Sequence, residues 1–169
     1  FLEANGALLE ILPVNKDGEL DLAALERALK KRSASEAILV SLMAANNETG
    51  VVLPWEKALE LTHAHGGCFH LDGVQAPGKL PGFSLRSQSV DLASFSAHKI
   101  GGAKGVGALV VRRGVKLVSL LHGGAQERKR RAGTLNVPGI AAFGAAASAL
   151  GSRDLARISR LRSILEERV

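Results

Sequence analysis

The sequence contains few cysteines and aromatic residues, and it has no long hydrophobic run. Cys68 is the single cysteine among 169 residues, which excludes a disulfide within the chain and a zinc site built from several cysteines. Aromatic residues make up only 4%, which argues against a surface that stacks nucleic-acid bases. No apolar run approaches the roughly 20 residues that cross a bilayer. We therefore expect no metal site, no nucleic-acid partner and no membrane partner.

The remaining composition fits one ordinary domain. Hydrophobic residues make up 46% of the chain, which is enough to bury a sizeable core. The sequence begins at Phe1 rather than at Met, and we see no basic and apolar leader of the kind that directs secretion. We expect a cytoplasmic protein of which this chain is a piece. The formal net charge of +6 permits an anionic partner but selects none.

Hydrophobic periodicity predicts helices that alternate with short strands. Leu22, Leu25 and Leu29 recur at helical spacing, whereas the continuous apolar run over 37–43 indicates a strand buried on both faces. The same criteria predict helices over 20–32, 54–65, 139–150 and 155–165 and strands over 37–43, 67–71, 90–95 and 107–112. This alternation is typical of an α/β domain with a mainly parallel sheet flanked by helices.

Two parts of the chain are expected to differ in role. We expect residues 1–151 to form the core of one domain. Residues 152–169 read as a helix that leads toward a C-terminal domain absent from this sequence.

Polar residues follow three of the predicted strands at their carboxyl ends. Asn46 and Asn47 follow the first, Asp72 and Gln75 follow the second, and Ser96-Ala97-His98-Lys99 follows the third. Ligands of α/β sheets collect beyond these ends. A lysine amine attacks aldehydes when its surroundings lower its pKa, and pyridoxal phosphate is such an aldehyde. That cofactor also needs an anion near its ring nitrogen, a donor for its ring oxygen and donors for its phosphate, and all these residue types are present.

Longer motifs surround these residues in a distinctive order. They span residues 40–50, 70–79, 90–99, 123–128 and 131–134. With these motifs the chain resembles the central part of a cysteine desulfurase, in the class V aminotransferase group of pyridoxal phosphate enzymes. The resemblance implies the large domain of fold type I enzymes. It also implies that L-cysteine is converted to L-alanine, with sulfur passing to an enzyme cysteine as a persulfide for iron–sulfur cluster or thio-cofactor synthesis.

The resemblance further implies a homodimer and a role for each polar residue. Lys99 would bind the cofactor covalently and later move protons at the substrate. Asp72 would pair with the ring nitrogen, Gln75 would donate to the ring oxygen, and Asn47 would contact the cofactor and help place the substrate. A sulfur-acceptor protein such as an iron–sulfur scaffold would be a partner. The phosphate would be held by Ser96, His98 and, in the partner subunit, Thr134.

Each assignment has a structural alternative. An aspartate before glycine is common in turns, so Asp72 could be a turn residue, and Asn46 and Asn47 could serve their loop. Gln75 and His98 could be exposed surface residues, and Thr134 could cap a helix.

The whole chain also has alternatives. It could belong to a selenocysteine lyase or another class V enzyme, which share the cofactor contacts. It could instead be a basic binding module with a vestigial site, because the run Arg128-Lys129-Arg130-Arg131 would bind phosphates by charge. Cys68 falls on a predicted core strand and does not suit the sulfur-accepting role. We therefore expect little or no turnover from this chain alone, since a catalytic cysteine loop is missing.

Overall fold

The computed structural model describes residues 6–33, 35–86, 88–152 and 154–168. Residues 1–5, 34 and 87 of the predicted core 1–151 lie outside this part of the chain, as do residues 153 and 169 of the predicted helix 152–169. The described elements nearly coincide with those expected from periodicity. In chain order they are α1 (Leu22–Lys30), β1 (Leu39–Met43), α2 (Trp55–Ala64), β2 (Cys68–Asp72), β3 (Leu92–Ser96), η2 (Ala97–Ile100), β4 (Gly107–Val111), α3 (Gln126–Lys129), α4 (Val137–Ser148), η3 (Ala149–Ser152) and α5 (Leu155–Glu166).

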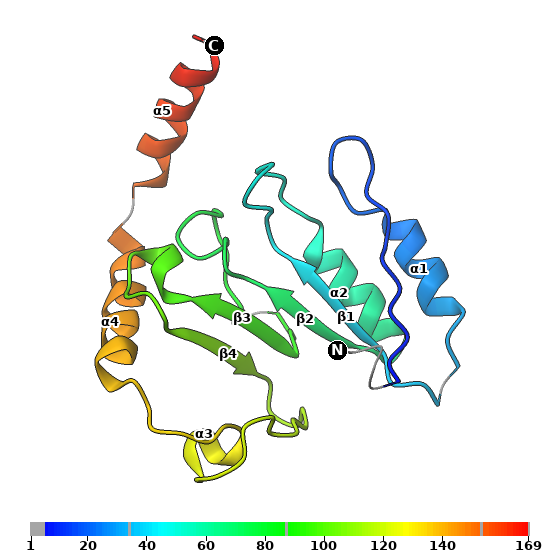
Figure 1. Ribbon diagram of the computed structural model, residues 1–169. Coiled ribbons are helices and arrows are strands. Elements are labelled where there is room, and N and C mark those ends of the chain that lie inside the picture. The colour runs from blue at the N-terminus through cyan, green and yellow to red at the C-terminus, as the bar shows by residue number, and fades with distance from the viewer. Residues whose placement is uncertain (1–5, 34, 87, 153, 169) are drawn as a thin grey trace.

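The strands form one sheet in the order β1-β2-β3-β4. Strands β1, β2 and β3 are parallel, and β4 runs antiparallel to β3. The register aligns Met43 with Asp72 and Asp72 with Ser94, so the carboxyl ends of the three parallel strands meet at one edge (Figure 1). The predicted α/β fold with a mainly parallel sheet is confirmed.

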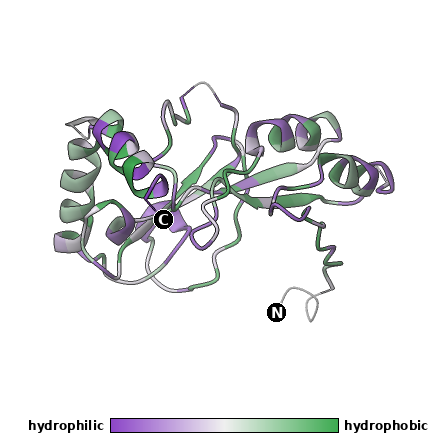
Figure 2. Cartoon of the chain, turned by 90° about the horizontal axis from the view of Figure 1, so that it is seen from above, coloured by the Kyte–Doolittle hydropathy of each residue, from purple (hydrophilic) through white to green (hydrophobic). Residues whose placement is uncertain are grey.

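Helices α1 and α2 cover one face of the sheet. Helix α2 packs on β1 and β2, and α1 packs on α2. The helices present apolar and polar residues on different sides (Figure 2), because leucines at helical spacing share one face. Phe69, Leu71 and Ala93 have no exposed surface and form the centre of the core. We call this side the covered face.

The opposite side of the sheet corrects one prediction. The strand over 37–43 was expected to be buried on both faces, but Leu39 and Met43 of β1 are 59% and 37% exposed. Successive side chains of a strand point to opposite faces, and the described residues place no helix over these two. We call this side the open face. On β1, β2 and β3 it consists of Leu39, Ser41, Met43, Cys68, His70, Asp72, Leu92, Ser94 and Ser96.

Helix α4 lies at the carboxyl end of β3. Helix α4 packs against η2, and α5 extends away from the sheet (Figure 1). Asn136 caps α4 by accepting a hydrogen bond from the Gly139 N–H at 3.1 Å, so Thr134 is not the cap. No helix in the described part of the chain is long and apolar enough to cross a membrane.

Candidate functional site

Lys99 lies on a single turn of 3-10 helix that follows β3 directly. Ala97 and Ile100 of η2 are buried, because residues three apart share one side of such a helix. The intervening His98 and Lys99 consequently face away from the buried side of the turn. The turn ends at Gly101, whose φ of 92° is readily adopted only by glycine. Local packing therefore fixes the backbone that carries the lysine.

The Lys99 side chain is half-buried and lacks a partner. Neither an ion pair nor a hydrogen bond involves its Nζ within the described residues. Most lysines lie fully in solvent, whereas this amine stands at the sheet edge where ligands collect in α/β folds. It is available to react with a carbonyl group.

Asp72 ends β2 and uses only part of its hydrogen-bonding capacity. Its Oδ1 accepts from the Val74 N–H at 3.0 Å, so the turn role considered from the sequence is present. Its Oδ2 accepts no hydrogen bond from the described residues. The backbone on both sides is fixed, because the Asp72 carbonyl accepts from Ala44 and the Gly73 N–H donates to the Ser94 carbonyl. One oxygen of a firmly held, half-buried carboxylate thus remains free for a ligand.

The two asparagines after β1 have different environments. The Asn46 Oδ1 accepts from the Glu48 and Thr49 N–H groups at 2.8 and 3.0 Å, so Asn46 stabilises its own loop. Asn47 is exposed, and the described residues provide no hydrogen bond to its side chain. The loop alternative therefore holds for Asn46, and Asn47 keeps a free amide at the site edge.

Ser96 and His98 form a pair. The Ser96 Oγ and the His98 Nδ1 lie 2.9 Å apart, although the residues belong to different elements, the end of β3 and the turn η2. Both groups can donate hydrogen bonds to an anion. Their contact places two possible phosphate ligands together beside Lys99.

Gln75 and Thr134 are less tightly connected to this group. The Gln75 Oε1 accepts from the Lys79 ammonium, which leaves its amide nitrogen to donate. Thr134 is exposed in the segment between α3 and α4. No hydrogen bond in the described part of the chain joins it to the other predicted residues. The structure thus gathers the strand-end residues at one edge but does not bring Thr134 into direct contact with them.

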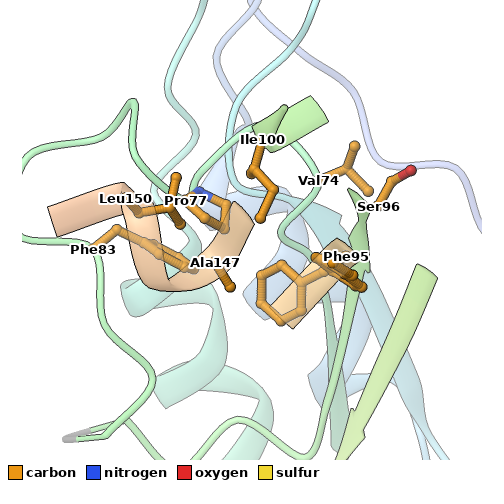
Figure 3. A pocket seen from close by; sticks show the side chains of 9 residues that line it. Val74, Pro77, Phe83, Phe95, Ser96, Ile100, Ala147 and Leu150 are labelled. Atoms are coloured by element: carbon orange, nitrogen blue, oxygen red, sulfur yellow. The ribbon is translucent and has the colours of Figure 1, made fainter. Parts of the chain in front are cut away.

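An apolar cavity of about 200 Å³ lies behind the lysine turn. Figure 3 shows Phe95, Ile100 and Ala147 around it, from β3, η2 and α4. Neither Lys99 nor Asp72 lines it. Ser96 is the one predicted site residue that lines the cavity, and the other lining residues are apolar, so the cavity lies between the carboxyl end of β3 and α4.

Cys68 lies at the opposite end of β2 from Asp72. Burial is the main factor that raises the pKa of its thiol, and the nearby Asp91 carboxylate raises it further. A thiol with a raised pKa is a poor nucleophile because less of it is thiolate. These properties agree with the expectation that Cys68 is not the sulfur-accepting residue.

Sequence reasoning missed three polar side chains on the open face. The His70 Nδ1 lies 2.8 Å from the Ser41 Oγ, and its Nε2 lies 2.7 Å from the Ser94 Oγ. We call this chain of contacts the Ser–His–Ser ladder. The spacing His70-Leu71-Asp72 could have indicated it, because residues two apart in a strand share a face. Which serines reach the histidine depends on strand pairing.

The residues at the edge fit the chemistry of pyridoxal phosphate. The cofactor needs an amine, an anion near its ring nitrogen and phosphate donors. The structure provides the unpartnered Lys99 amine, the free Asp72 oxygen and the Ser96–His98 pair at one sheet edge.

Comparison with known proteins gives an independent result. The chain matches the aminotransferase class-V family over residues 2–169. It is 50% identical to the cysteine desulfurase IscS of Anaeromyxobacter sp. (strain Fw109-5), over 98% of this chain and 41% of that protein. It is 48% identical to a cysteine desulfurase of Cereibacter sphaeroides, over 96% and 41%. The chain thus spans 41% of the length of these curated relatives.

Solved structures agree with these relatives. A NifS-like protein superposes with a TM-score of 0.87 at 40% identity, covering 98% of this chain and 46% of that one. A NifS-like protein from Rickettsia africae ESF-5 gives 0.86 at 34% identity, covering 93% and 44%. A structure of SspA in complex with cysteine gives 0.79 at 31%, covering 98% and 47%.

These matches confirm the resemblance drawn from the motifs. Enzymes of this family depend on pyridoxal phosphate, in agreement with the cofactor expected from the strand-end residues. The chain belongs to the class-V aminotransferase family and is homologous to cysteine desulfurases.

Proposed function

We propose that this chain is the cofactor-binding core of a cysteine desulfurase. The observation that supports this most is the half-buried, unpartnered Lys99 on the turn after β3, next to the strand that ends at Asp72. Residues 1–151 would form the core, and residues 152–169 would lead toward a further domain. The whole protein would act in the cytoplasm.

Each residue at the sheet edge has a defined task in this proposal. Lys99 binds the cofactor aldehyde and afterwards moves protons at the substrate, and Asp72 offers its free oxygen to the ring nitrogen. Bound pyridoxal phosphate would supply a positively charged ring that withdraws electrons from the substrate carbon. The Gln75 amide donates to the ring oxygen, and Asn47 helps place the substrate. The phosphate ligands are Ser96, His98 and, toward the partner subunit of a homodimer, Thr134.

The proposed net reaction converts L-cysteine to L-alanine. The carbon–sulfur bond of the substrate breaks, and sulfur passes to an enzyme cysteine as a persulfide, with no external oxidant or reductant. Cys68 does not suit this step because of its position and raised pKa. We therefore propose that the accepting cysteine lies outside this chain, and that the chain alone has little or no turnover. An acceptor protein for iron–sulfur cluster or thio-cofactor synthesis would take the sulfur onward.

The first experiment locates the cofactor. Pyridoxal phosphate is added, the near-visible absorbance is recorded, and borohydride reduction is followed by peptide mapping. Lys99→Ala is compared with Lys104→Ala, a matched change at an exposed lysine five positions along the chain. Label at Lys99 that disappears only in Lys99→Ala supports the site. Equal labelling of several surface lysines contradicts the proposed site if it is also found when this chain is placed in a full-length relative, the chimera described next.

The chimera tests the reaction. This chain replaces the matching 41% of the Anaeromyxobacter desulfurase, which supplies the remaining parts. With a thiol reductant in the assay to release the persulfide sulfur as sulfide, we expect alanine and sulfide from cysteine in the chimera and not from the chain alone. Sustained turnover by the chain alone would refute the proposed lack of activity. A chimera that releases selenide from selenocysteine and leaves cysteine intact would instead favour a selenocysteine lyase.

A further inference from the structure

The Ser–His–Ser ladder crosses the three parallel strands on the open face. Ser41 is on β1, His70 on β2 and Ser94 on β3. The two contacts of 2.8 and 2.7 Å use both ring nitrogens of His70. The ladder therefore links the three neighbouring strands through side chains as well as through the backbone.

The ladder ends beside Asp72. His70 precedes Asp72 by two residues on the same face, and Ser94 is the register partner of Asp72. Ser94 therefore holds β2 twice, through its Oγ to His70 and through its carbonyl oxygen to the Gly73 N–H. On the other side, the Ala44 N–H binds the Asp72 carbonyl. The ladder adds side-chain bonds to the backbone bonds that already hold this strand end.

The ladder can be satisfied while His70 is uncharged. A neutral imidazole has one donor and one acceptor, and a serine hydroxyl rotates to complement either. Burial is the main influence on the pKa of His70 and lowers it, while the Asp72 carboxylate raises it by less. Among the charged groups of the described chain, Asp72 alone has a resolved influence on His70. Both the geometry and the electrostatics suit an imidazole that is neutral near pH 7.

We propose that His70 is a positioning residue for Asp72, because the Ser–His–Ser ladder holds the end of β2 and keeps the free carboxylate oxygen directed at the ring nitrogen of the cofactor. This inference rests on the proposed pyridoxal phosphate site. As a neutral side chain, His70 leaves the negative charge of Asp72 uncompensated for that nitrogen. A charged His70 would reduce the pull of the carboxylate on the ring proton.

The test removes the ladder and keeps the fold. His70→Leu abolishes both contacts, and His70→Gln retains an amide donor and acceptor. Cys68→Ala is the matched control, because Cys68 lies on the same strand and face but outside the ladder. All variants are made in the chimera described above. Cofactor affinity and the pH midpoint of the lysine-linked absorbance band are measured, together with melting temperature in the absence of cofactor.

The expected pattern separates positioning from general stability. His70→Leu weakens cofactor affinity about tenfold, as expected for the loss of hydrogen bonds that order one charged ligand. It also raises the pH midpoint of the band, because a less firmly protonated ring withdraws less charge from the Lys99 nitrogen. His70→Gln restores most of both properties, and Cys68→Ala changes neither. A matching affinity and pH midpoint in His70→Leu and the wild type would overturn the proposal.

Two further results distinguish a failure of the ladder proposal from a failure of the proposed function. If the wild-type chimera forms no band at Lys99, the cofactor site itself is wrong, and the ladder proposal falls with it. If the wild type forms the band but His70→Leu behaves like the control, only the ladder proposal fails. Nitrogen-15 NMR without cofactor provides another check. We expect one protonated ring nitrogen on His70 at pH 7, and a doubly protonated ring would overturn the proposal.

Discussion

Two aspartates next to neighbouring strands have opposite environments. Asp91 immediately precedes β3 and is 3% exposed. Its Oδ2 accepts from the Phe69 N–H and from His63, each at 2.8 Å, and its Oδ1 accepts from Arg112. Asp72, at the far end of β2, is half-buried and accepts one bond at Oδ1. Asp91 is saturated by its own chain, whereas Asp72 retains a free oxygen.

The difference indicates which carboxylate can serve a ligand. Burial by itself would raise the pKa of Asp91, but the hydrogen bonds from His63 and Phe69 and the charge of Arg112 outweigh it and lower that pKa. These three interactions of Asp91 all stabilise the fold. The free oxygen of Asp72 contributes little to the fold and is available for a cofactor. Mutation should therefore separate stability at Asp91 from binding at Asp72.

The largest expected effect is the loss of stability in Asp91→Ala. The variant leaves the buried Phe69 N–H without an acceptor, and it leaves His63 and Arg112 without their carboxylate partner. We expect the free energy of unfolding to fall by about 3 kcal/mol, measured by urea denaturation. His63→Ala is the control that removes one partner only and should cost less. A loss equal to that of His63→Ala would contradict the central role of Asp91.

The second effect is the loss of cofactor binding in Asp72→Ala. We expect affinity for pyridoxal phosphate to fall about 30-fold, or about 2 kcal/mol, because the ring would lose the charged partner proposed for it. The melting temperature without cofactor should change much less than in Asp91→Ala. Absorbance titration and thermal unfolding measure the two quantities in the chimera. A large stability loss with unchanged affinity would reverse the comparison between the two aspartates.

A smaller effect is expected from Gly73→Ala, next to Asp72. A Cβ at this position would lie 2.5 Å from the Phe95 Cε1, so the ring must move. The adjoining cavity is lined by Phe95 and offers space for that movement. We expect a loss of about 1 kcal/mol in the free energy of unfolding. The double variant Gly73→Ala/Phe95→Leu should recover part of it, and strictly additive losses would exclude this contact as the cause.

The smallest effect is a change in the acid stability of the wild type relative to Asp91→Asn. The pKa of Asp91 is lower in the folded state. Its contribution to stability is therefore fully present above the unfolded pKa of about 3.9. The contribution is lost as pH falls through the folded pKa. The advantage of the wild type over Asp91→Asn should therefore be constant near neutral pH and shrink below about pH 4. Unfolding free energies between pH 7 and pH 3 measure this, and an advantage that grows in acid would show the opposite sign.

Local patterns predicted most of the fold but not the covering of the sheet. Leucine spacing located α1, and the glycines after α2 ended it, with Gly66 at φ 72°. These are local effects of backbone conformation and periodicity. The apolar run over 37–43 indicated burial on both faces, but Leu39 and Met43 remain exposed. Whether a neighbouring layer is present is not encoded in the run itself.

The site was predictable to a similar extent. Lys99, Asp72 and the Ser96–His98 pair follow strands whose carboxyl ends share an edge once the strands are parallel. Asn46 was ambiguous because asparagine serves loops and ligands equally well, and only its bonds to Glu48 and Thr49 assign it to the loop. The role of Thr134 in the partner subunit stays a prediction.

The succession of strands and helices along the chain, the residue types at the strand ends and the family could be read from the sequence. All three depend on local periodicity and on motifs within short stretches. Tertiary structure decided which polar groups are satisfied and which are free. His63, Asp91 and Arg112 come together from distant positions, as do Ser41, His70 and Ser94. Such contacts depend on strand pairing and side-chain direction, and these are fixed only when the whole sheet has formed.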